Sequence, residues 1–446
     1  MLYLESCRIS VFGRKKYGKV FTYWLGTTPR IVVLDPEMIK QILSNKFGHV
    51  EKAVPNIQLR RLTGDYSLTR VEGEEWARHR RILNPVFHLE NLKSMVPVVA
   101  SSTVKVLEKW GDAIARGVKE IEVYEEFRCL TADVIARTAF GTSFEQGKDV
   151  FIMLAEQTVL AGRAMGQFYI PGSRFLPTAD NLRAKRLERA MQKSLRRLIM
   201  NRKENADMGK TECYGSDLLG LLIAAYNDEL NARKNFVRVS LEHVVDECRT
   251  FFNAGHETTS TLLAWTIVLL GMHTNWQERA REEVLHLFKK ETPNADALSR
   301  LKVVNMILYE ALRLYPPVAV MVRTTYKKMQ LEGLTLPAGT ELVLPTIAVH
   351  HDADVWGKDV NDFNPGRFSQ GISKACTHPA AFVGFSMGPR VCIGQNFALI
   401  EAKVVISMIL QRFSFVTSPG YVHDPAWILT VRPRHGAQIS FQELTS

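Results

Sequence analysis

Hydrophobic residues recur every three to four positions through the middle of the chain, and this period is typical of helices packed on a core. The predicted helices span residues 76–84, 92–115, 126–140, 149–164, 182–205, 217–227, 241–273, 276–290 and 303–314. Pro316 and Pro317 end the last of these, because proline cannot continue a helix. One more helix is predicted over 395–413. The pattern therefore indicates a mainly α-helical protein.

Shorter segments have the alternation of strands. Residues 20–33 predict two strands around a turn at Gly26, and Asp35-Pro36-Glu37 then begins a helix that runs through Leu43. Further strands are expected in small sheets near the C-terminal end, at residues 318–323, 330–337 and 341–345 and after the last helix.

Residues 348–390 show neither period and are expected to be irregular. So long an irregular stretch within a compact domain usually serves a function.

The composition, with 46% hydrophobic and 23% charged residues, is ordinary for a packed globular protein. No internal repeat or low-complexity linker divides the sequence, and one domain over residues 1–446 is expected. The net charge of +11 favours an acidic partner or an anionic surface. Basic residues cluster at 14–16, 78–81 and 183–203 without a nucleic-acid-binding motif, so a basic docking face is favoured over nucleic acid.

Six cysteines without a CxxC pair do not form a disulfide framework, and a reducing compartment fits. The N-terminal residues resemble neither a signal peptide nor a membrane span. The longest apolar stretch, 258–272, is shorter than the roughly 20 residues of a spanning helix and predicts a core helix.

Cys392 lies in a glycine-rich turn directly before a predicted helix. Gly388 and Gly394 permit tight turns and the close approach of a bulky planar group. The unpaired N–H groups of a helix N-terminus stabilise a thiolate, and Arg390 adds a positive charge for a carboxylate of a ligand. Because a buried thiolate without a metal is costly, this turn predicts a metal site.

A lone structural cysteine is the simpler interpretation, but the F-x-x-G-x-R-x-C-x-G spacing from Phe385 to Gly394 argues against it. Zinc is the other metal considered, with Cys376, His378 and Cys392 as ligands. Their spacing fits no structural zinc pattern.

A second motif interrupts the apolar helix predicted over 241–273. The small pair Ala254-Gly255 would let a flat group lie against the helix or let the helix open locally, since glycine in a helix costs about 1 kcal/mol relative to alanine. Glu257 and Thr258 place an acid beside an alcohol and would pass protons to metal-bound oxygen. The simpler interpretation is a solvated glutamate and a threonine bonded back to its helix.

The cysteine turn resembles the haem-binding signature of the cytochrome P450 superfamily, and the resemblance extends from about Tyr17 to the end of the chain. Residues 76–85 and 368–375 are similar to plant microsomal members that oxidise terpenoids, steroids, hormones and fatty acids. The resemblance implies a large helical domain around a haem, with small β-sheets and Cys392 bound to the iron.

It also implies roles for further residues. Glu257 and Thr258 would be catalytic, as part of the A-G-x-[DE]-T motif. The residues implied to bind haem are Trp76, Arg80, Ala254, Arg323, Phe385, Arg390 and Gly394. Glu310 and Arg313 resemble the E-x-x-R pair that braces the loop leading to the cysteine, and Arg367 resembles its third partner. Two positions depart from the family pattern, namely Gly366 for glutamate and Gly384 for proline.

The implied reaction inserts one oxygen atom of O2 into a hydrophobic small molecule, such as a terpenoid, hormone or fatty acid. The expected substrate lining includes Ala254 and residues 318–322. No nucleotide-binding glycine loop is apparent, so electrons are expected from NADPH through a reductase with an acidic docking face.

The family implies the cytosolic face of the endoplasmic reticulum membrane. This chain begins near the segment 12–18 without the usual membrane helix, so a truncated or a soluble form is expected. Two alternatives stay open, a haem-thiolate isomerase or dehydratase acting on peroxides and an inactive truncated product. The Glu257-Thr258 pair argues against the first, because peroxide rearrangement needs no proton delivery to bound oxygen.

Overall fold

The computed structural model describes residues 13–26, 28–45, 48–54, 57–142, 144–165, 176–210, 213–231 and 239–444. The chain divides into two compact units, with boundaries after Ala53, Val98, Arg128 and Glu257. The last three boundaries fall within helices α5 (Leu89–Ala115), α6 (Val123–Phe140) and α10 (Leu241–Met272). We describe each unit separately, calling the one with the C-terminal residues the first unit.

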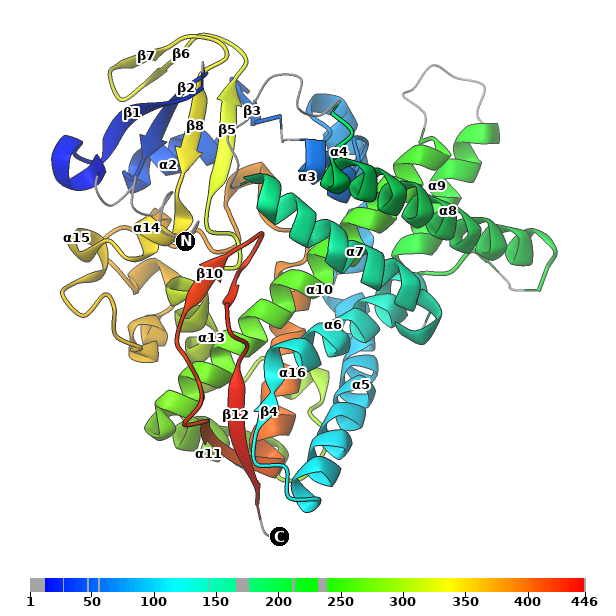
Figure 1. Ribbon diagram of the computed structural model, residues 1–446, viewed down its shortest axis with the longest axis vertical. Coiled ribbons are helices and arrows are strands. Elements are labelled where there is room, and N and C mark those ends of the chain that lie inside the picture. The colour runs from blue at the N-terminus through cyan, green and yellow to red at the C-terminus, as the bar shows by residue number, and fades with distance from the viewer. Residues whose placement is uncertain are drawn as a thin grey trace. The chain divides into compact units, whose positions relative to one another are not determined.

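The first unit contains the five-stranded sheet with the order β1-β2-β8-β5-β3 (Figure 1). Its strands are β1 (Val20–Leu25), β2 (Thr28–Val33), β8 (Glu341–Leu344), β5 (Met321–Thr325) and β3 (Val50–Lys52). Only β2 and β8 pair in parallel; the other pairs are antiparallel. The hairpin of β6 (Met329–Leu331) and β7 (Leu334–Leu336) lies near it. The expected strand at 318–323 begins three residues later, because Pro316 and Pro317 hold the chain before it out of the ladder.

Further small sheets in this unit join segments that lie far apart in the sequence. One has the order β4 (Ile121–Glu122), β12 (Gln438–Glu443) and β9 (Phe413–Thr417). The other pairs β10 (Pro425–Trp427) with β11 (Val431–Pro433).

Helices fill the rest of the first unit, and the C-terminal half of α10 forms its centre. Leu263, Trp265 and Leu270 on this half have no exposed surface, and the Trp265 indole donates to the Val431 carbonyl at 2.6 Å. The apolar stretch 258–272 is thus a core helix, as predicted. The other helices are α2 (Pro36–Ser44), α11 (Thr274–Phe288), α12 (Ala295–Leu298), α13 (Val303–Leu314), α14 (Thr346–His350), α15 (Ala353–Trp356) and α16 (Gln395–Arg412).

The segment expected to be irregular, 348–390, is ordered by short turns. It holds the end of α14, all of α15, and the 3-10 helices η3 (Pro365–Gln370), η4 (Ile372–Lys374), η5 (Pro379–Ala381) and η6 (Gly388–Arg390). Local caps start some of them; the Asp352 carboxylate, for example, accepts from the Asp354 N–H at 2.9 Å. Elements of three to six residues are too short to show a hydrophobic period, so the sequence pattern did not reveal them.

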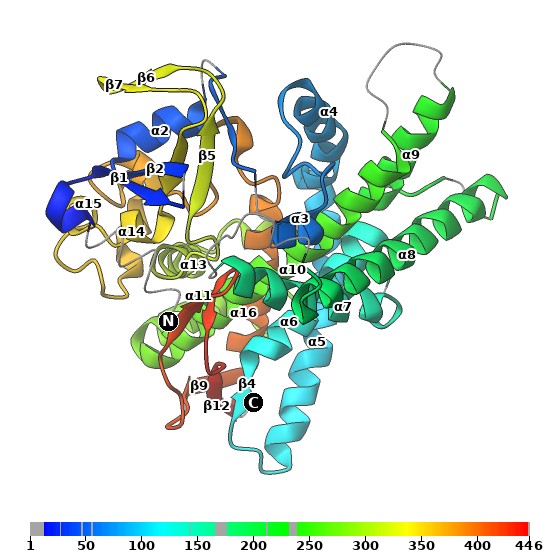
Figure 2. The ribbon, with the colours of Figure 1, turned by 45° about the horizontal axis from the view of Figure 1, so that its top comes forward.

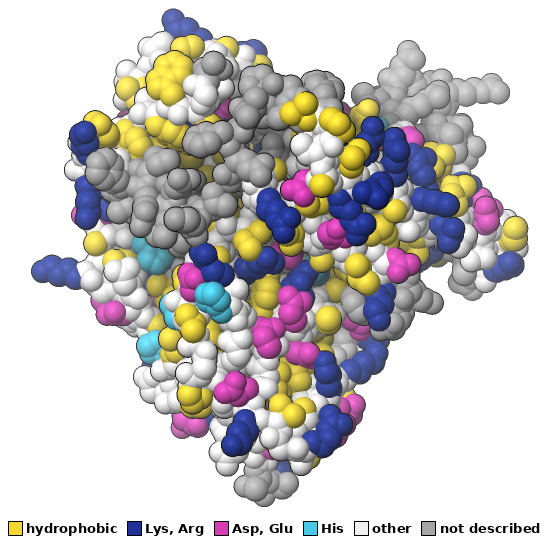
Figure 3. Space-filling view, in the orientation of Figure 1, with side chains coloured by type: hydrophobic (Ala, Val, Ile, Leu, Met, Phe, Trp, Pro, Cys, Tyr) yellow, Lys and Arg dark blue, Asp and Glu magenta, His cyan; other side chains and the backbone are white. Residues whose placement is uncertain are grey.

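The second unit is helical. Besides the parts of α5, α6 and α10 that belong to it, its described helices are α3 (Ile57–Thr63), α4 (Gly73–Leu83), the 3-10 helix η1 (Asn84–Phe87), α7 (Phe144–Met165), α8 (Ala179–Asp207) and α9 (Leu218–Asn231). Helix α7 packs on α3 and α8, and Figure 2 shows α7 and α8 side by side. Helix α8 buries Leu187, Met191 and Leu195 along one face. Arginine and lysine side chains cover its exposed face (Figure 3), so this helix has the period of an amphipathic surface helix.

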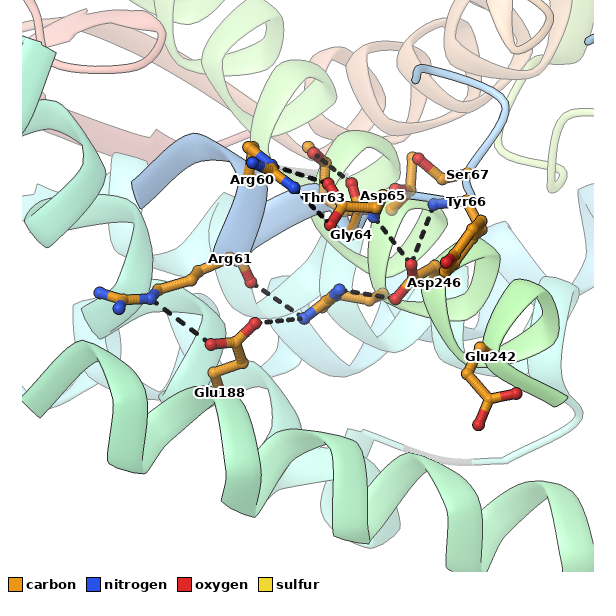
Figure 4. A network of polar contacts seen from close by, with 12 residues as sticks. Arg60, Arg61, Thr63, Gly64, Asp65, Tyr66, Ser67, Glu188, Glu242 and Asp246 are labelled. Atoms are coloured by element: carbon orange, nitrogen blue, oxygen red, sulfur yellow. Dashed lines mark hydrogen bonds and ion pairs between the residues drawn. The ribbon is translucent and has the colours of Figure 1, made fainter. Parts of the chain in front are cut away.

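A polar network ties the end of α3 to α10 (Figure 4). The Asp246 carboxylate accepts from the backbone N–H groups of Asp65 and Tyr66 at 2.8 and 3.0 Å, and Arg249 donates to it at 2.6 Å. Gly64 has φ +77°, and a Cβ there would lie 2.1 Å from the Asp246 carboxyl carbon. Glycine is therefore required where the chain passes over this carboxylate.

No helix in the described part of the chain combines the length and apolarity needed to cross a bilayer.

Candidate functional site

Cys392 lies on an exposed turn between η6 and α16 in the first unit. Its backbone N–H donates to the Phe385 carbonyl at 2.9 Å and closes the turn. The Val391 N–H donates to the Gly388 carbonyl at 3.1 Å. Hydrogen bonds therefore fix the backbone around the thiol, and the Cys392 side chain is exposed.

The two glycines of the turn have different tasks. Gly388 has φ +70°, and a Cβ there would lie 2.4 Å from the Leu43 carbonyl oxygen. The close approach at Gly388 is thus to the end of α2, in addition to the tight turn that the sequence predicts. Gly394 is the N-cap of α16, and its carbonyl accepts the Ala398 N–H at 2.9 Å. The predicted helix N-terminus beside Cys392 is present.

A buried acid–arginine pair holds the segment that leads to this turn. Arg313 and Glu310 on α13 have no exposed side-chain surface, and the guanidinium donates to both carboxylate oxygens at 2.7 and 2.8 Å. Arg313 also donates to the carbonyls of His350, Val360 and Asp362, at 3.0, 2.7 and 3.2 Å. The guanidinium thus joins the helix to three points of the segment between α14 and η3.

Arg367 belongs to the same cluster, with its Nε 3.5 Å from a Glu310 oxygen and one Nη donating to the Trp356 carbonyl at 2.8 Å. Arg367 therefore contacts the Glu310–Arg313 pair although the residue before it is Gly366 and not the glutamate of the family pattern. The Asn364 N–H also donates to Glu310, at 2.9 Å.

His350 extends this cluster toward the cysteine, and sequence reasoning did not find it. Its Nδ1–H donates to the Arg313 carbonyl at 3.1 Å, and its Nε2 accepts the Val383 N–H at 3.0 Å. Burial lowers the pKa of His350 to about 3, so the ring is neutral at physiological pH. The resemblance pointed to Glu310, Arg313 and Arg367; His350 is distinguished by its contacts to the Arg313 carbonyl and the Val383 N–H, which join segments far apart in the chain.

The remaining predicted residues of the first unit lie on β5, on α10 and on the cysteine turn itself. Arg323 on β5 is 9% exposed and donates to the Val322 carbonyl at 3.1 Å. Thr258 is half-buried on α10. Phe385 and Arg390 are half-buried on the cysteine turn itself.

In the second unit, Trp76 and Arg80 are four residues apart on α4 and therefore lie on one side of that helix. Both side chains are half-buried. The helix begins at Gly73, three residues before the predicted start.

Ala254 is exposed in the middle of α10, between the buried residues Asn253 and His256. A Cβ on Gly255 would lie 2.8 Å from the Ile135 side chain of α6. Gly255 thus allows α6 to pack closely against α10. The sequence had suggested other reasons for this glycine, namely a flat ligand lying against the helix or a local opening of the helix.

Glu257 is 2% exposed and lies beside His256. The His256 Nδ1–H donates to the Phe252 carbonyl at 2.6 Å, and its Nε2 is 3.9 Å from a Glu257 carboxylate oxygen. The Thr131 hydroxyl donates to the His256 carbonyl at 3.0 Å. The acid is therefore buried beside His256 and is not the solvated glutamate of the simpler interpretation.

An exposed thiol on a braced turn, next to a helix N-terminus, fits a haem-thiolate protein. The comparisons agree: the cytochrome P450 family model matches residues 12–441. Cytochrome P450 CYP72A616 of Paris polyphylla is 47% identical over 433 residues, which are 96% of this chain and 82% of that protein. Cytochrome P450 734A1 of Arabidopsis thaliana is 44% identical over 439 residues, 97% of this chain and 82% of that protein.

Among solved structures, retinoic acid-bound cyanobacterial CYP120A1 superimposes with a TM-score of 0.85 at 25% identity, covering 99% of this chain and 95% of that one. The chain belongs to the cytochrome P450 family. It is a P450 monooxygenase with the P450 fold, and haem is its cofactor. The resemblance found in the sequence is thereby confirmed.

Proposed function

We propose that this enzyme oxidises a hydrophobic small molecule with O2, with the Cys392 thiolate as the ligand of the haem iron. The observation that carries the assignment is the exposed Cys392 on a turn closed by its own N–H bond to Phe385. Haem ligated by a thiolate supplies O–O bond cleavage. The protein positions the haem and the substrate, and it supplies charged groups and protons.

The other haem contacts are proposed from both units. In the first unit, Phe385 and Gly394 would help to hold the haem, and Arg323 and Arg390 would pair with its carboxylates. In the second, Trp76, Arg80 and Ala254 would contribute further haem contacts. We infer on the same ground that residues 1–446 act as one haem-binding domain.

Glu257 and Thr258 are the proposed proton-delivery pair. The Glu257 carboxyl is buried and is adjacent in sequence to Thr258. Glu257 would hold a proton at a carboxyl oxygen, and the Thr258 hydroxyl would pass it on. Such a pair is needed to reduce O2 and is not needed to rearrange a peroxide.

The substrate class is terpenoid, hormone or fatty-acid-like. Ala254 is exposed on a buried helix, and Val318 is 46% exposed before β5, so both offer apolar surface. The cyanobacterial neighbour was solved with retinoic acid, an apolar isoprenoid acid.

Electrons are proposed to come from NADPH through a reductase that docks on basic residues, at the cytosolic face of the endoplasmic reticulum membrane. The net charge of +11 supports an acidic partner face. Added salt should therefore slow reduction by the reductase, because screening weakens charged encounters.

The central test is the carbon-monoxide difference spectrum of the reduced protein. Wild type should show the red-shifted Soret band of a thiolate-ligated haem, Cys392→Ser should lose it, and the matched control Cys376→Ser should keep it. Folded wild-type protein without this band would refute the assignment.

Activity is then measured on a panel of plant terpenoids and fatty acids with NADPH and reductase, with products followed by mass spectrometry. Turnover of a peroxide without NADPH, and of no panel member with it, would favour the isomerase alternative.

A further inference from the structure

A cluster of side chains that could bind a metal ion lies in the second unit, and two of its members are the sequence neighbours of the proposed haem-binding residues Trp76 and Arg80. Glu75 and His79 are one turn apart on α4, and His243 comes from the first turn of α10. One ligand atom from each lies within 4.8 Å of the others, and Glu75 Oε1 is 3.1 Å from His243 Nε2. The ligands of a tetrahedral zinc ion, each about 2.0–2.1 Å from it, are about 3.3–3.5 Å apart. Small side-chain movements would therefore reach this geometry.

The histidine rings are oriented by their other nitrogens. Glu247 Oε1 accepts the Leu68 N–H at 2.7 Å, so the 2.6 Å contact from His79 Nδ1 is a donated hydrogen bond. His243 Nδ1 accepts the Ser240 N–H at 3.1 Å and lies 2.7 Å from the Ser240 hydroxyl. Nε2 of His79 is therefore able to bind an ion as it stands, and Nε2 of His243 is able to do so once the ring proton has moved to Nδ1. A carboxylate behind a histidine is the usual support of a metal-binding ring.

The buried carboxyl group of Glu247, behind His79, also points to a cation at this cluster. It has no exposed surface, and its Oε2 has no hydrogen-bond partner in the structure. Glu75 and Glu247 thus place two carboxyl groups around two histidines, and a divalent cation would balance their charge.

We propose that Glu75, His79 and His243 bind one zinc ion, with water in the fourth position. Two ring nitrogens and one carboxylate suit zinc, whereas calcium and magnesium prefer oxygen ligands. The Glu75 side chain is 32% exposed and gives the ion a path from solvent. Binding moves the single ring proton of His243 from Nε2 to Nδ1, where the Ser240 hydroxyl oxygen 2.7 Å away accepts it. Protons compete with the ion for the ring nitrogens, so affinity falls as the pH is lowered. The ion links α4, which carries Trp76 and Arg80, to α10.

The test is calorimetric titration of haem-loaded, chelator-treated full-length protein with zinc sulfate. Wild type should bind one ion per chain, and Glu75→Gln and His243→Gln should each weaken binding at least tenfold. These two residues are chosen because His79→Gln would also remove the partner of the buried Glu247. The matched control is His286→Ala, an exposed histidine on α11.

X-ray absorption at the zinc edge identifies the ligands independently of stability. It should show nitrogen and oxygen neighbours with the outer-shell scattering of two imidazoles, reduced to one in His243→Gln. Unchanged affinity in both variants, or wild-type binding weaker than about 1 mM, would overturn the proposal. The haem spectrum of each variant confirms that it is folded.

Discussion

Two acid–arginine pairs with the same spacing along a helix hold distant segments with different shares of the two charges. On α13, Glu310 and Arg313 are three residues apart; the arginine donates to three backbone carbonyls, and the carboxylate accepts one backbone N–H. On α10, Asp246 and Arg249 are also three residues apart, but the carboxylate accepts two backbone N–H groups, and the arginine donates to one backbone carbonyl.

The two pairs also differ in how completely they are satisfied. The Arg313 Nε donates to Glu310, whereas the Nε of the equally buried Arg249 has no hydrogen-bond partner in the structure. An i,i+3 pair in a sequence therefore does not tell which charge holds a second segment, because that depends on the backbone groups facing the pair. The comparison predicts a larger loss at α13 than at α10.

The largest effect is expected from Arg313→Ala. It leaves Glu310 as an uncompensated buried charge and removes three bonds to backbone carbonyls, so the folded state should lose about 3–5 kcal/mol. Arg313→Lys should rescue little, since a single ammonium does not replace the planar fork. Denaturant unfolding and the haem content of purified protein check this. Haem content unchanged in Arg313→Ala would contradict the brace.

A smaller and more local loss is expected from Asp246→Asn. The amide keeps one acceptor oxygen but loses the charge that Arg249 faces, so a loss of about 1–3 kcal/mol is expected. Hydrogen exchange should rise at Asp65 and Tyr66 and stay unchanged at Cys392. If Asp246→Asn lowers stability as much as Arg313→Ala, the two pairs do not differ as their contacts indicate.

The sequence predicted some of these features better than others. The long helices follow from hydrophobic period, and the predicted 241–273 and 303–314 differ little from α10 and α13. The helix α3 was missed because two turns show too little period. The glycine turn around Cys392 predicted a metal site, and the family resemblance added haem as its ligand and the role of the Glu310–Arg313 pair. His350 and the Glu75–His79–His243 cluster depend on contacts between elements far apart in the chain, which no local pattern encodes.

His350 connects the α13 pair to the cysteine segment and should make the brace sensitive to acid. Its folded-state pKa of about 3 lies below the usual 6.5, so the unfolded chain binds a proton first as the pH falls. The stability contribution is complete above pH 6.5 and is lost toward pH 3, by at most about 1.4 kcal/mol per pH unit.

Urea unfolding of wild type and His350→Gln at pH 7.5 and pH 5 checks this. The glutamine variant should be less stable at pH 7.5, and its stability should fall less between the two pH values. A parallel fall in both proteins would assign the acid sensitivity to other groups.

The smallest effect concerns a buried acid that, unlike Glu310 and Asp246, has no arginine. Glu401 on α16 is 1% exposed, and both its carboxyl oxygens lack a hydrogen-bond partner in the structure. Burial raises its pKa well above the usual value. The unfolded chain therefore releases this proton above about pH 4.5 while the folded chain retains it, so the group lowers stability increasingly as the pH rises.

Glu401→Met, which removes the carboxyl at similar volume, should stabilise the protein by about 1 kcal/mol at neutral pH. The gain should shrink toward pH 4.5, and denaturant midpoints across this range measure it. A destabilised Glu401→Met at pH 7.5 would mean that the carboxyl has a partner in the folded protein, and the contrast with the two paired acids would then fail.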